Sequence, residues 1–98
     1  MTQKLDDTQR ADLLTPLLDA GWTHDATRDA IQKTFVFKNF VGAFGWMAQA
    51  ALHAEKLNHH PEWSNVYKTV DVTLTTHDVG GLSELDITLA TRMEALAS

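Results

Sequence analysis

Residues 39–63 read NFVGAFGWMAQAALHAEKLNHHPEW, and this stretch decides the fold. Asn39 is a favourable N-cap, and the apolar residues after it recur at steps of three and four, as on a helix with one apolar face. Pro61 disfavours helical geometry at the residue before it, so the helix is expected to end at about Asn58. We therefore predict one main helix over residues 40–57, with an apolar stripe of Phe40, Phe44, Met47, Ala51 and Ala54.

The segments on either side of this helix have the alternating polarity of strands. A short strand over residues 22–25 and a longer one over 31–38 are expected before it. After it, residues 66–67 and 69–76 predict a hairpin. In the second hairpin strand Val70, Val72 and Leu74 share one face, because side chains alternate along a strand.

Two further helices are expected near the ends of the chain. Leucines at helical spacing predict a first helix over residues 6–20, which Gly21 stops and the interior Pro16 bends. Ser83 and Asp86 have the spacing of a capping box and predict the start of a last helix. Gly42 and Gly45, inside the main helix, are expected where another backbone approaches closely.

The order of helix, two strands, helix, two strands, helix predicts an α+β fold: a four-stranded antiparallel sheet with helices packed on one face. No repeat, linker or low-complexity tract interrupts the 98 residues, so residues 1–98 are expected to form a single domain. Open sheet edges are usually covered or paired, and pairing between identical chains would do this. A homo-oligomer is therefore expected.

Composition and charge exclude several classes of partner. The net charge of −5, with scattered Lys and Arg, argues against contact with nucleic acid, which needs a clustered basic face. No apolar stretch approaches the ~20 residues that span a membrane, and the polar start does not have the pattern of a secretory signal. The chain has no cysteine, hence no disulfide, and we expect a cytoplasmic protein.

Histidines stand where elements of the predicted fold end. His59 and His60 follow the main helix, His77 stands at the end of a strand, and Asp86 lies in the first turn of the last helix. Strand and helix ends tend to cluster at one edge of a sheet, so these side chains are expected to meet there. Imidazoles are the natural proton carriers at neutral pH, which predicts acid/base chemistry.

Other interpretations of these residues stay open. Surface histidines without a role are common, and we keep that interpretation for His24 and His53. Three histidines also suggest catalytic zinc, although neighbouring residues of an extended segment point apart. Glu55 and Asp86 form either an acid/base pair or, more simply, a solvated charge and a helix-dipole carboxylate. Trp46 is expected in the core, whereas Trp22 and Trp63, outside the long helices, are expected to border a ligand.

The chain resembles a known family over nearly its whole length after the first helix. The segments AEKLNHHPEW (54–63), NVY (65–67), LTTH (74–77) and GLSELDI (81–87) closely resemble the pterin-4a-carbinolamine dehydratases. That family includes a dimerisation cofactor of a hepatocyte nuclear factor. The resemblance implies helices on one side of an antiparallel sheet, assembly into homodimers or homotetramers, and a hydro-lyase without metal or cofactor. Its substrate would be 4a-hydroxytetrahydropterin, which aromatic amino acid hydroxylases produce.

The resemblance also implies which residues form the site. The family's active-site histidines match His59, His60 and His77, its supporting acids match Glu55 and Asp86, and its pterin-contacting strand matches Thr75 and Thr76, with Trp22 near the ring. Asn58 replaces the aspartate often found before the histidine pair, and its amide still forms hydrogen bonds.

We hypothesise that His59 is the principal acid/base, that His77 is a second proton carrier, and that His60 binds and orients the substrate. Asp86 is expected to hold one imidazole and fix its tautomer. Two competing functions remain: a dimerisation module for a transcription factor with incidental activity, and a zinc hydrolase.

Overall fold

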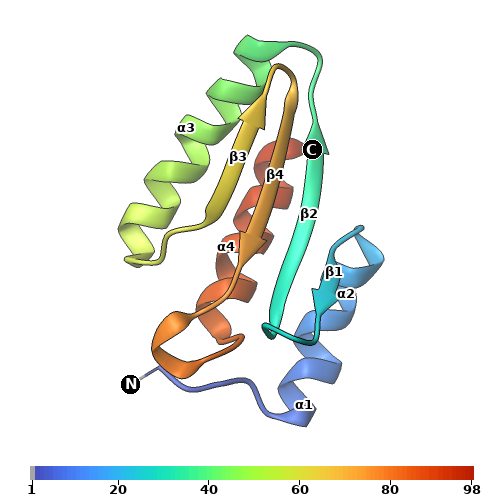
Figure 1. The fold of residues 1–98 in the computed structure, drawn as a ribbon, viewed down its shortest axis with the longest axis vertical. Helices are drawn as coiled ribbons and strands as arrows, with labels where there is room; N and C mark the ends of the chain where they lie inside the picture. Colours follow the sequence, from blue (N-terminus) through green and yellow to red (C-terminus); the bar gives the residue numbers. More distant parts are fainter. Residues whose placement is uncertain (1) are drawn as a thin grey trace.

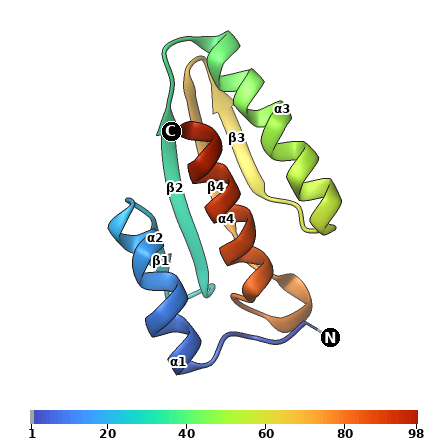
Figure 2. The same cartoon turned by 180° about the vertical axis from the view of Figure 1, so that it is seen from behind.

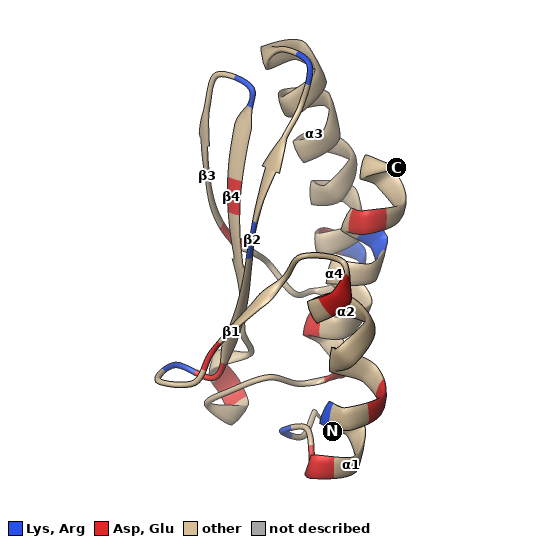
Figure 3. Ribbon diagram, turned by 90° about the vertical axis from the view of Figure 1, so that its right-hand side faces the viewer, with Lys and Arg blue, Asp and Glu red and all other residues tan. Residues whose placement is uncertain are grey.

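The computed structural model describes residues 2–98, and its centre is a four-stranded antiparallel sheet with all helices on one face (Figures 1 and 3). The strand order is β1-β2-β4-β3. The strands are β1 Thr23–Asp25, β2 Ala30–Val36, β3 Glu62–Val66 and β4 Thr69–Leu74. This arrangement confirms the predicted α+β architecture.

The N-terminal helical segment comprises α1 (Asp7–Gln9), a π-helical stretch (Arg10–Leu14) and α2 (Thr15–Asp19). Pro16 is the second residue of α2, and the irregularity expected at the proline is the π-helical stretch that ends two residues before it. Because proline has no N–H, one carbonyl of the preceding turn loses its usual donor. The hydroxyl of Thr15 donates to the carbonyl of Ala11 at 2.8 Å, and the segment ends at Gly21, which has φ 108°.

The main helix, α3 (Phe40–Leu57), has the predicted bounds, and the side chain of Asn39 accepts the N–H of Gly42. The predicted apolar stripe was wrong at Phe40, Phe44 and Ala51, whereas Met47 packs against the core and Ala54 is buried. The core takes Ala43, Trp46, Ala50 and Ala54, whereas Phe40 and Phe44 are 48% and 56% exposed, and Ala51 is exposed.

The reason lies in how α3 packs. Apolar residues surround much of this helix, and the face with three alanines lets it approach the sheet and α4 closely. The predicted close approach at Gly45 was also wrong within one chain, since nothing lies within 4 Å of a Cβ built there. At Gly42 such a Cβ would meet the side chains of Asn39 at 3.3 Å and Phe37 at 3.7 Å.

The hairpin is shifted from its predicted bounds. Strand β3 begins at Glu62, earlier than expected, and β4 ends at Leu74 rather than residue 76. Val70, Val72 and Leu74 are buried as predicted. The turn between the strands uses Tyr67 with φ 51°. Beyond β4, Thr76 bridges to Gly81 around the short 3-10 turn His77–Val79.

The last helix, α4 (Glu84–Ala97), starts with the predicted capping box of Ser83 and Asp86. Seen from behind, α4 lies across the sheet beside α3, with α1 and α2 at the other side (Figure 2). Leu89, Ala90 and Met93 of α4 are fully buried against the inward face of the sheet. Among residues 2–98 no helix is long and apolar enough to cross a membrane.

Candidate active site

The end of α3 directs the histidine pair. Asn58 ends the helix in the left-handed conformation, with φ 51° and ψ 44°. Asparagine tolerates this conformation better than most residues because its short polar side chain forms local hydrogen bonds. The N–H of His59 then donates to the carbonyl of Ala54 at 3.0 Å, which folds the chain back over the last turn. His59 is thereby buried, with 8% of it exposed, while His60 points to solvent.

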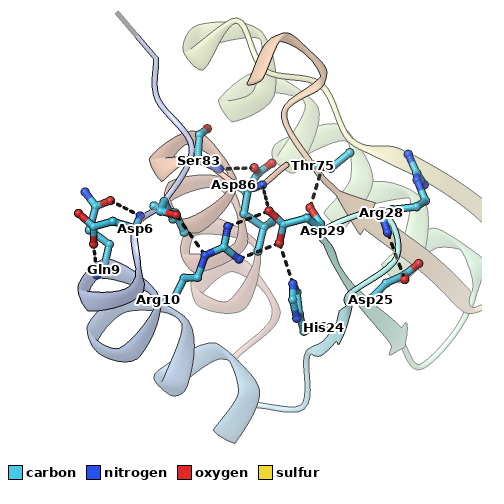
Figure 4. A network of polar contacts seen from close by, with 12 residues as sticks. Asp6, Gln9, Arg10, His24, Asp25, Arg28, Asp29, Thr75, Ser83 and Asp86 are labelled. Atoms are coloured by element: carbon cyan, nitrogen blue, oxygen red, sulfur yellow. Dashed lines mark hydrogen bonds and ion pairs between the residues drawn. The ribbon is translucent and has the colours of Figure 1, made fainter. Parts of the chain in front are cut away.

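A buried carboxylate holds His59. Asp86 is completely buried, and its Oδ1 lies 2.5 Å from Nε2 of His59. Its Oδ2 accepts the hydroxyl of Thr76 at 2.8 Å. The same oxygen accepts the N–H of Ser83 at 3.0 Å (Figure 4). Ser83 and Thr76 also share a hydrogen bond of 2.6 Å between their hydroxyl oxygens. Both oxygens of this carboxylate are therefore satisfied, and a carboxylate only accepts, so Nε2 of His59 carries a proton.

The second histidine has a carboxylate partner as well. Nε2 of His60 lies 2.9 Å from Oε1 of Glu55, which belongs to the last turn of α3. Both side chains are mainly in solvent, with 60% and 80% exposed, so this pair is weakly held compared with His59 and Asp86.

The third histidine belongs to a chain of three ionisable groups, His77, Glu62 and Arg28. Nε2 of His77 lies 3.0 Å from Oε2 of Glu62, the first residue of β3. Two nitrogens of the Arg28 guanidinium donate to the two oxygens of Glu62, at 3.0 and 2.8 Å. The hydrogen bond from Arg28, and next that from His77, lower the pKa of Glu62 to about 2. Glu62 is therefore an anion at neutral pH.

These residues meet at one hollow in the surface. It has a volume of about 320 Å³ and lies where α3, β4 and the start of α4 come together. Small-molecule sites commonly measure ~300–1,000 Å³, so this one is at the lower limit. Its lining consists of Thr2, Asn58, His59, His60, Thr75, Thr76, His77, Asp78 and Leu85. Two larger hollows, of about 550 and 520 Å³, have no histidine in their lining.

Both tryptophans expected beside a ligand lie elsewhere. Trp22 is 2% exposed, packs edge-on against Phe35, and donates its indole N–H to Glu94 at 3.0 Å. A buried indole has no free face on which a flat ring could stack, so that expectation is corrected. Trp63 is half-buried on the inward side of the sheet, with its ring 6.3 Å from that of Trp46. Neither lines the hollow, because Trp22, directly before β1, lies in the core and Trp63 of β3 packs against it.

Glu55 reaches the site only through His60, and it is absent from the lining of the hollow. Thr75 does line it, and its hydroxyl donates to the carbonyl of Asp29 at 3.1 Å. Asp29 itself pairs with both ends of the Arg10 guanidinium and with His24 (Figure 4). The wall of the hollow is thus tied to the turn between β1 and β2.

Sequence reasoning identified Ser83 only as a helix cap, and it did not identify Glu62 or Arg28 as site residues. The sequence did contain a signal for Glu62, because this residue stands two positions after His60. It also starts strand β3, where it pairs with Thr73 near the end of β4. Arg28 left no such signal, because its partner is 34 residues away. Among residues 2–98 no group of three or more His, Cys, Asp or Glu side chains is arranged to hold a metal ion.

Fold and hollow together define an α+β protein with an imidazole-lined site suited to proton transfer. The family model described as pterin 4 alpha carbinolamine dehydratase matches residues 3–96. A relative from Jannaschia sp. (strain CCS1) is 67% identical over 97 residues, which make up 99% of each chain.

The pterin-4-alpha-carbinolamine dehydratase of Drosophila melanogaster is 58% identical over 98 residues, covering 100% of this chain and 51% of that protein. A solved structure, a transcriptional coactivator/pterin dehydratase from Brucella melitensis, matches with a TM-score of 0.89 and 50% identity, over 97% of this chain and 99% of that one. The chain therefore belongs to the pterin-4a-carbinolamine dehydratase family, a family of hydro-lyases.

Proposed function

We propose that the protein dehydrates 4a-hydroxytetrahydropterin to the quinonoid dihydropterin, with histidines as the acid and base, and so supports tetrahydropterin recycling. One observation carries the proposal: His59, His60 and His77, from two separate stretches of chain, line the same hollow. Family membership supports the substrate class, since the relatives are named for this dehydration.

The reaction needs two proton movements. One carbon of the substrate carries a hydroxyl and a ring nitrogen that bears hydrogen. The nitrogen lone pair forms a double bond to this carbon as the hydroxyl leaves. An imidazolium supplies a proton to the hydroxyl, which departs as water, and a neutral imidazole takes the proton from the nitrogen. No electron is gained or lost overall.

His59 is the principal acid/base in this proposal. Its Nε2 is engaged by Asp86, so protons enter and leave through Nδ1. No side-chain nitrogen or oxygen among residues 2–98 is both buried and without a hydrogen-bond partner. Because the His59 ring has no other hydrogen-bond partner in that part of the chain, Nδ1 is in contact with solvent, and the hollow is the opening that His59 lines.

The other lining residues bind the substrate. His77 is the second proton carrier, and His60, oriented by Glu55, contacts the pterin. Asn58 and the hydroxyl of Thr75 supply hydrogen bonds to a polar heterocycle, while Thr76, which also lines the hollow, donates its hydroxyl to Asp86. A flat ring in this position is surrounded by donors and acceptors, and Trp22 has no part in holding it.

Stopped-flow dehydration of a synthetic 4a-hydroxypterin tests the proposal. We expect His59→Ala to lower turnover by ~10²–10⁴-fold, the usual contribution of a positioned acid or base. His53→Ala is the matched control, because His53 lies on α3 and does not line the hollow. Wild-type turnover in purified, folded His59→Ala would contradict the assignment. Repeating the assay with a chelator tests the zinc alternative, and we expect unchanged turnover.

We also propose that the chain forms a homo-oligomer. One side of α3 presents Val41, Phe44 and Leu52, which are 78%, 56% and 74% exposed. Gly45 and Ala48 lie among them and are exposed too, so a second helix could approach closely. Large apolar side chains gathered on one helix face, beside small residues, favour a helix of another copy as the partner.

The alternative function is a dimerisation module for a transcription factor, with incidental activity. The Brucella melitensis protein is described as both a coactivator and a dehydratase, so the two functions are compatible in this fold. Protein pairing alone does not require imidazoles in a hollow, which favours the enzyme. Loss of turnover in His59→Ala with unchanged co-purifying partners would separate the two.

A further inference from the structure

We propose that Glu62, held in place by Arg28, is the positioning residue of His77 and makes Nδ1 the ring atom through which His77 exchanges protons. The inference rests on the proposed function, in which His77 carries a proton. It concerns two residues, Glu62 and Arg28, to which the family resemblance assigned no role.

The hydrogen on the neutral His77 ring is placed by the carboxylate of Glu62. Oε2 of Glu62 lies 3.0 Å from Nε2 of His77. Glu62 is ionised at neutral pH, because the hydrogen bonds from Arg28 and His77 lower its pKa to about 2. An ionised carboxylate accepts and never donates, so Nε2 carries the hydrogen and the neutral ring has its lone pair on Nδ1.

The His77 ring is held by a hydrogen bond and not by packing. His77 has 76% of its side chain exposed, so packing does not fix it. His59, by contrast, has 9% of its side chain exposed and is enclosed by its surroundings. The contact with Glu62 is the one side-chain hydrogen bond of His77 among residues 2–98. The orientation of the His77 ring therefore depends on its hydrogen bond to Glu62. The orientation of the His59 ring is also fixed by the packing around it.

Glu62 is held in turn by Arg28. Arg28 engages both carboxylate oxygens, a paired geometry that restricts rotation of the carboxylate. Arg28 belongs to the turn between β1 and β2, where the side chain of Asp25 accepts the backbone N–H groups of Thr27 and Arg28 (Figure 4). The next residue, Asp29, is anchored by Arg10. The guanidinium thus projects from a turn that is itself fixed.

The charges around His77 come from several elements. Glu62 and Arg28 lie on its Nε2 side, and Asp78 follows it in the 3-10 turn. His59 and His60 line the same hollow, with Asp86 behind His59. Of the carboxylates, Glu62 alone contacts the His77 ring among the described residues.

The experiment measures the tautomer and the turnover separately. Imidazole ¹⁵N chemical shifts of the free, full-length protein at about pH 9, where imidazoles are neutral, report which nitrogen carries hydrogen. We expect Nε2–H at His77 in the wild type and a mixture of tautomers in Glu62→Ala. Glu62→Gln, which keeps an acceptor oxygen, should restore part of the wild-type signal. Arg28→Ala should have an intermediate effect, because it leaves the acceptor in place.

Turnover should follow the tautomer. We expect kcat of Glu62→Ala to fall about three- to tenfold, a modest loss because exposed ion pairs are weak, with KM little changed. Asp71→Asn is the matched control, since Asp71 is an exposed sheet carboxylate that contacts Thr34 and does not line the hollow. Its kcat and its His77 signal should equal those of the wild type.

Each outcome decides the matter. Nδ1–H at His77 in the wild type, or an unchanged tautomer in Glu62→Ala, overturns the proposal. A changed tautomer with unchanged kcat overturns it too, provided that His77→Ala itself slows turnover. If His77→Ala has wild-type turnover, the assignment of His77 as a proton carrier fails instead, and the tautomer result shows whether Glu62 still positions the ring.

Discussion

Each of the three histidines of the site pairs with a carboxylate, and the three pairs differ in how deeply they are buried. His59, His60 and His77 each direct Nε2 at a carboxylate, from Asp86, Glu55 and Glu62 in turn. The pairs range from buried to largely exposed. Desolvation strengthens hydrogen bonds and makes unpaired groups costly, so the buried pair sets the position of its ring most firmly.

Asp29 forms a second group of ion pairs, and its carbonyl accepts the hydroxyl of Thr75 in the lining of the hollow. The hydrogen bond from Arg10 is the largest cause that holds the pKa of Asp29 far below its ordinary value of 3.8. A carboxyl with a lower pKa in the folded state than in the unfolded state stabilises the fold above the unfolded pKa. That contribution is lost as the pH falls through the folded pKa.

We expect Asp29→Asn to lower the free energy of unfolding by about 2 kcal/mol at neutral pH, because Arg10 loses its ionic partner. The difference in the free energy of unfolding between wild type and variant should decrease steadily below about pH 4, where the carboxyl of Asp29 in the unfolded state takes up its proton. Urea unfolding across pH 2–7 measures both curves. A gap that stays constant down to pH 2 would show that the charge of Asp29 does not stabilise the fold.

Among the elements, α3 links fold and site most directly. Its N-cap at Asn39 and its left-handed end at Asn58 define its length, and the second of these turns His59 inward. The same helix buries three alanines and Trp46 on one side and leaves large apolar residues on another. Strand β3 makes a comparable contribution, because its first residue, Glu62, holds His77.

Substitutions at Asn58 separate its backbone role from its proposed contact with substrate. Asn58→Gly should stay within about 0.5 kcal/mol of the wild type, while Asn58→Ala should lose about 1 kcal/mol, because the left-handed conformation strains alanine. Both variants remove the amide and should raise KM for the carbinolamine. Denaturant unfolding and steady-state kinetics provide the measurements. Equal stability of the two variants would mean that the cap conformation contributes nothing.

For the whole molecule, the sheet has one face that no helix covers (Figure 3) and two open edges, β1 and β3. Helix α3 also has an exposed apolar side. Association of identical chains through α3 would cover the apolar side. Each copy would then keep its own hollow, since the lining comes from one chain.

Sedimentation of the wild type should therefore give a multiple of the 10.9 kDa chain mass, either dimer or tetramer. Leu52→Glu, alone or with Val41→Glu, should shift the assembly toward smaller species, because a buried unpaired charge opposes association. Val36→Glu, at an exposed apolar residue of β2, is the control and should sediment as the wild type does. A wild type that sediments as a single chain at all concentrations would refute the proposed association.

Local patterns were sufficient to predict the class of fold, the bounds of α3, the capping box of α4 and the buried side of β4. Each depends on periodicity or on hydrogen bonds between residues a few positions apart, which the order of amino acids specifies directly. The histidines of the site were also predicted, through their positions at the ends of elements and through the family resemblance.

Tertiary packing alone decided the rest. It selected the alanine side of α3 for the core, turned Trp22 and Trp63 away from the hollow, and brought Arg28 to Glu62. These outcomes depend on which surfaces compete for the same buried space, and on contacts between residues 34 or more positions apart. The residues around either partner contain no local signal of such a contact. The contact forms, and stabilises the fold, only after the sheet and helices have brought distant parts of the chain together.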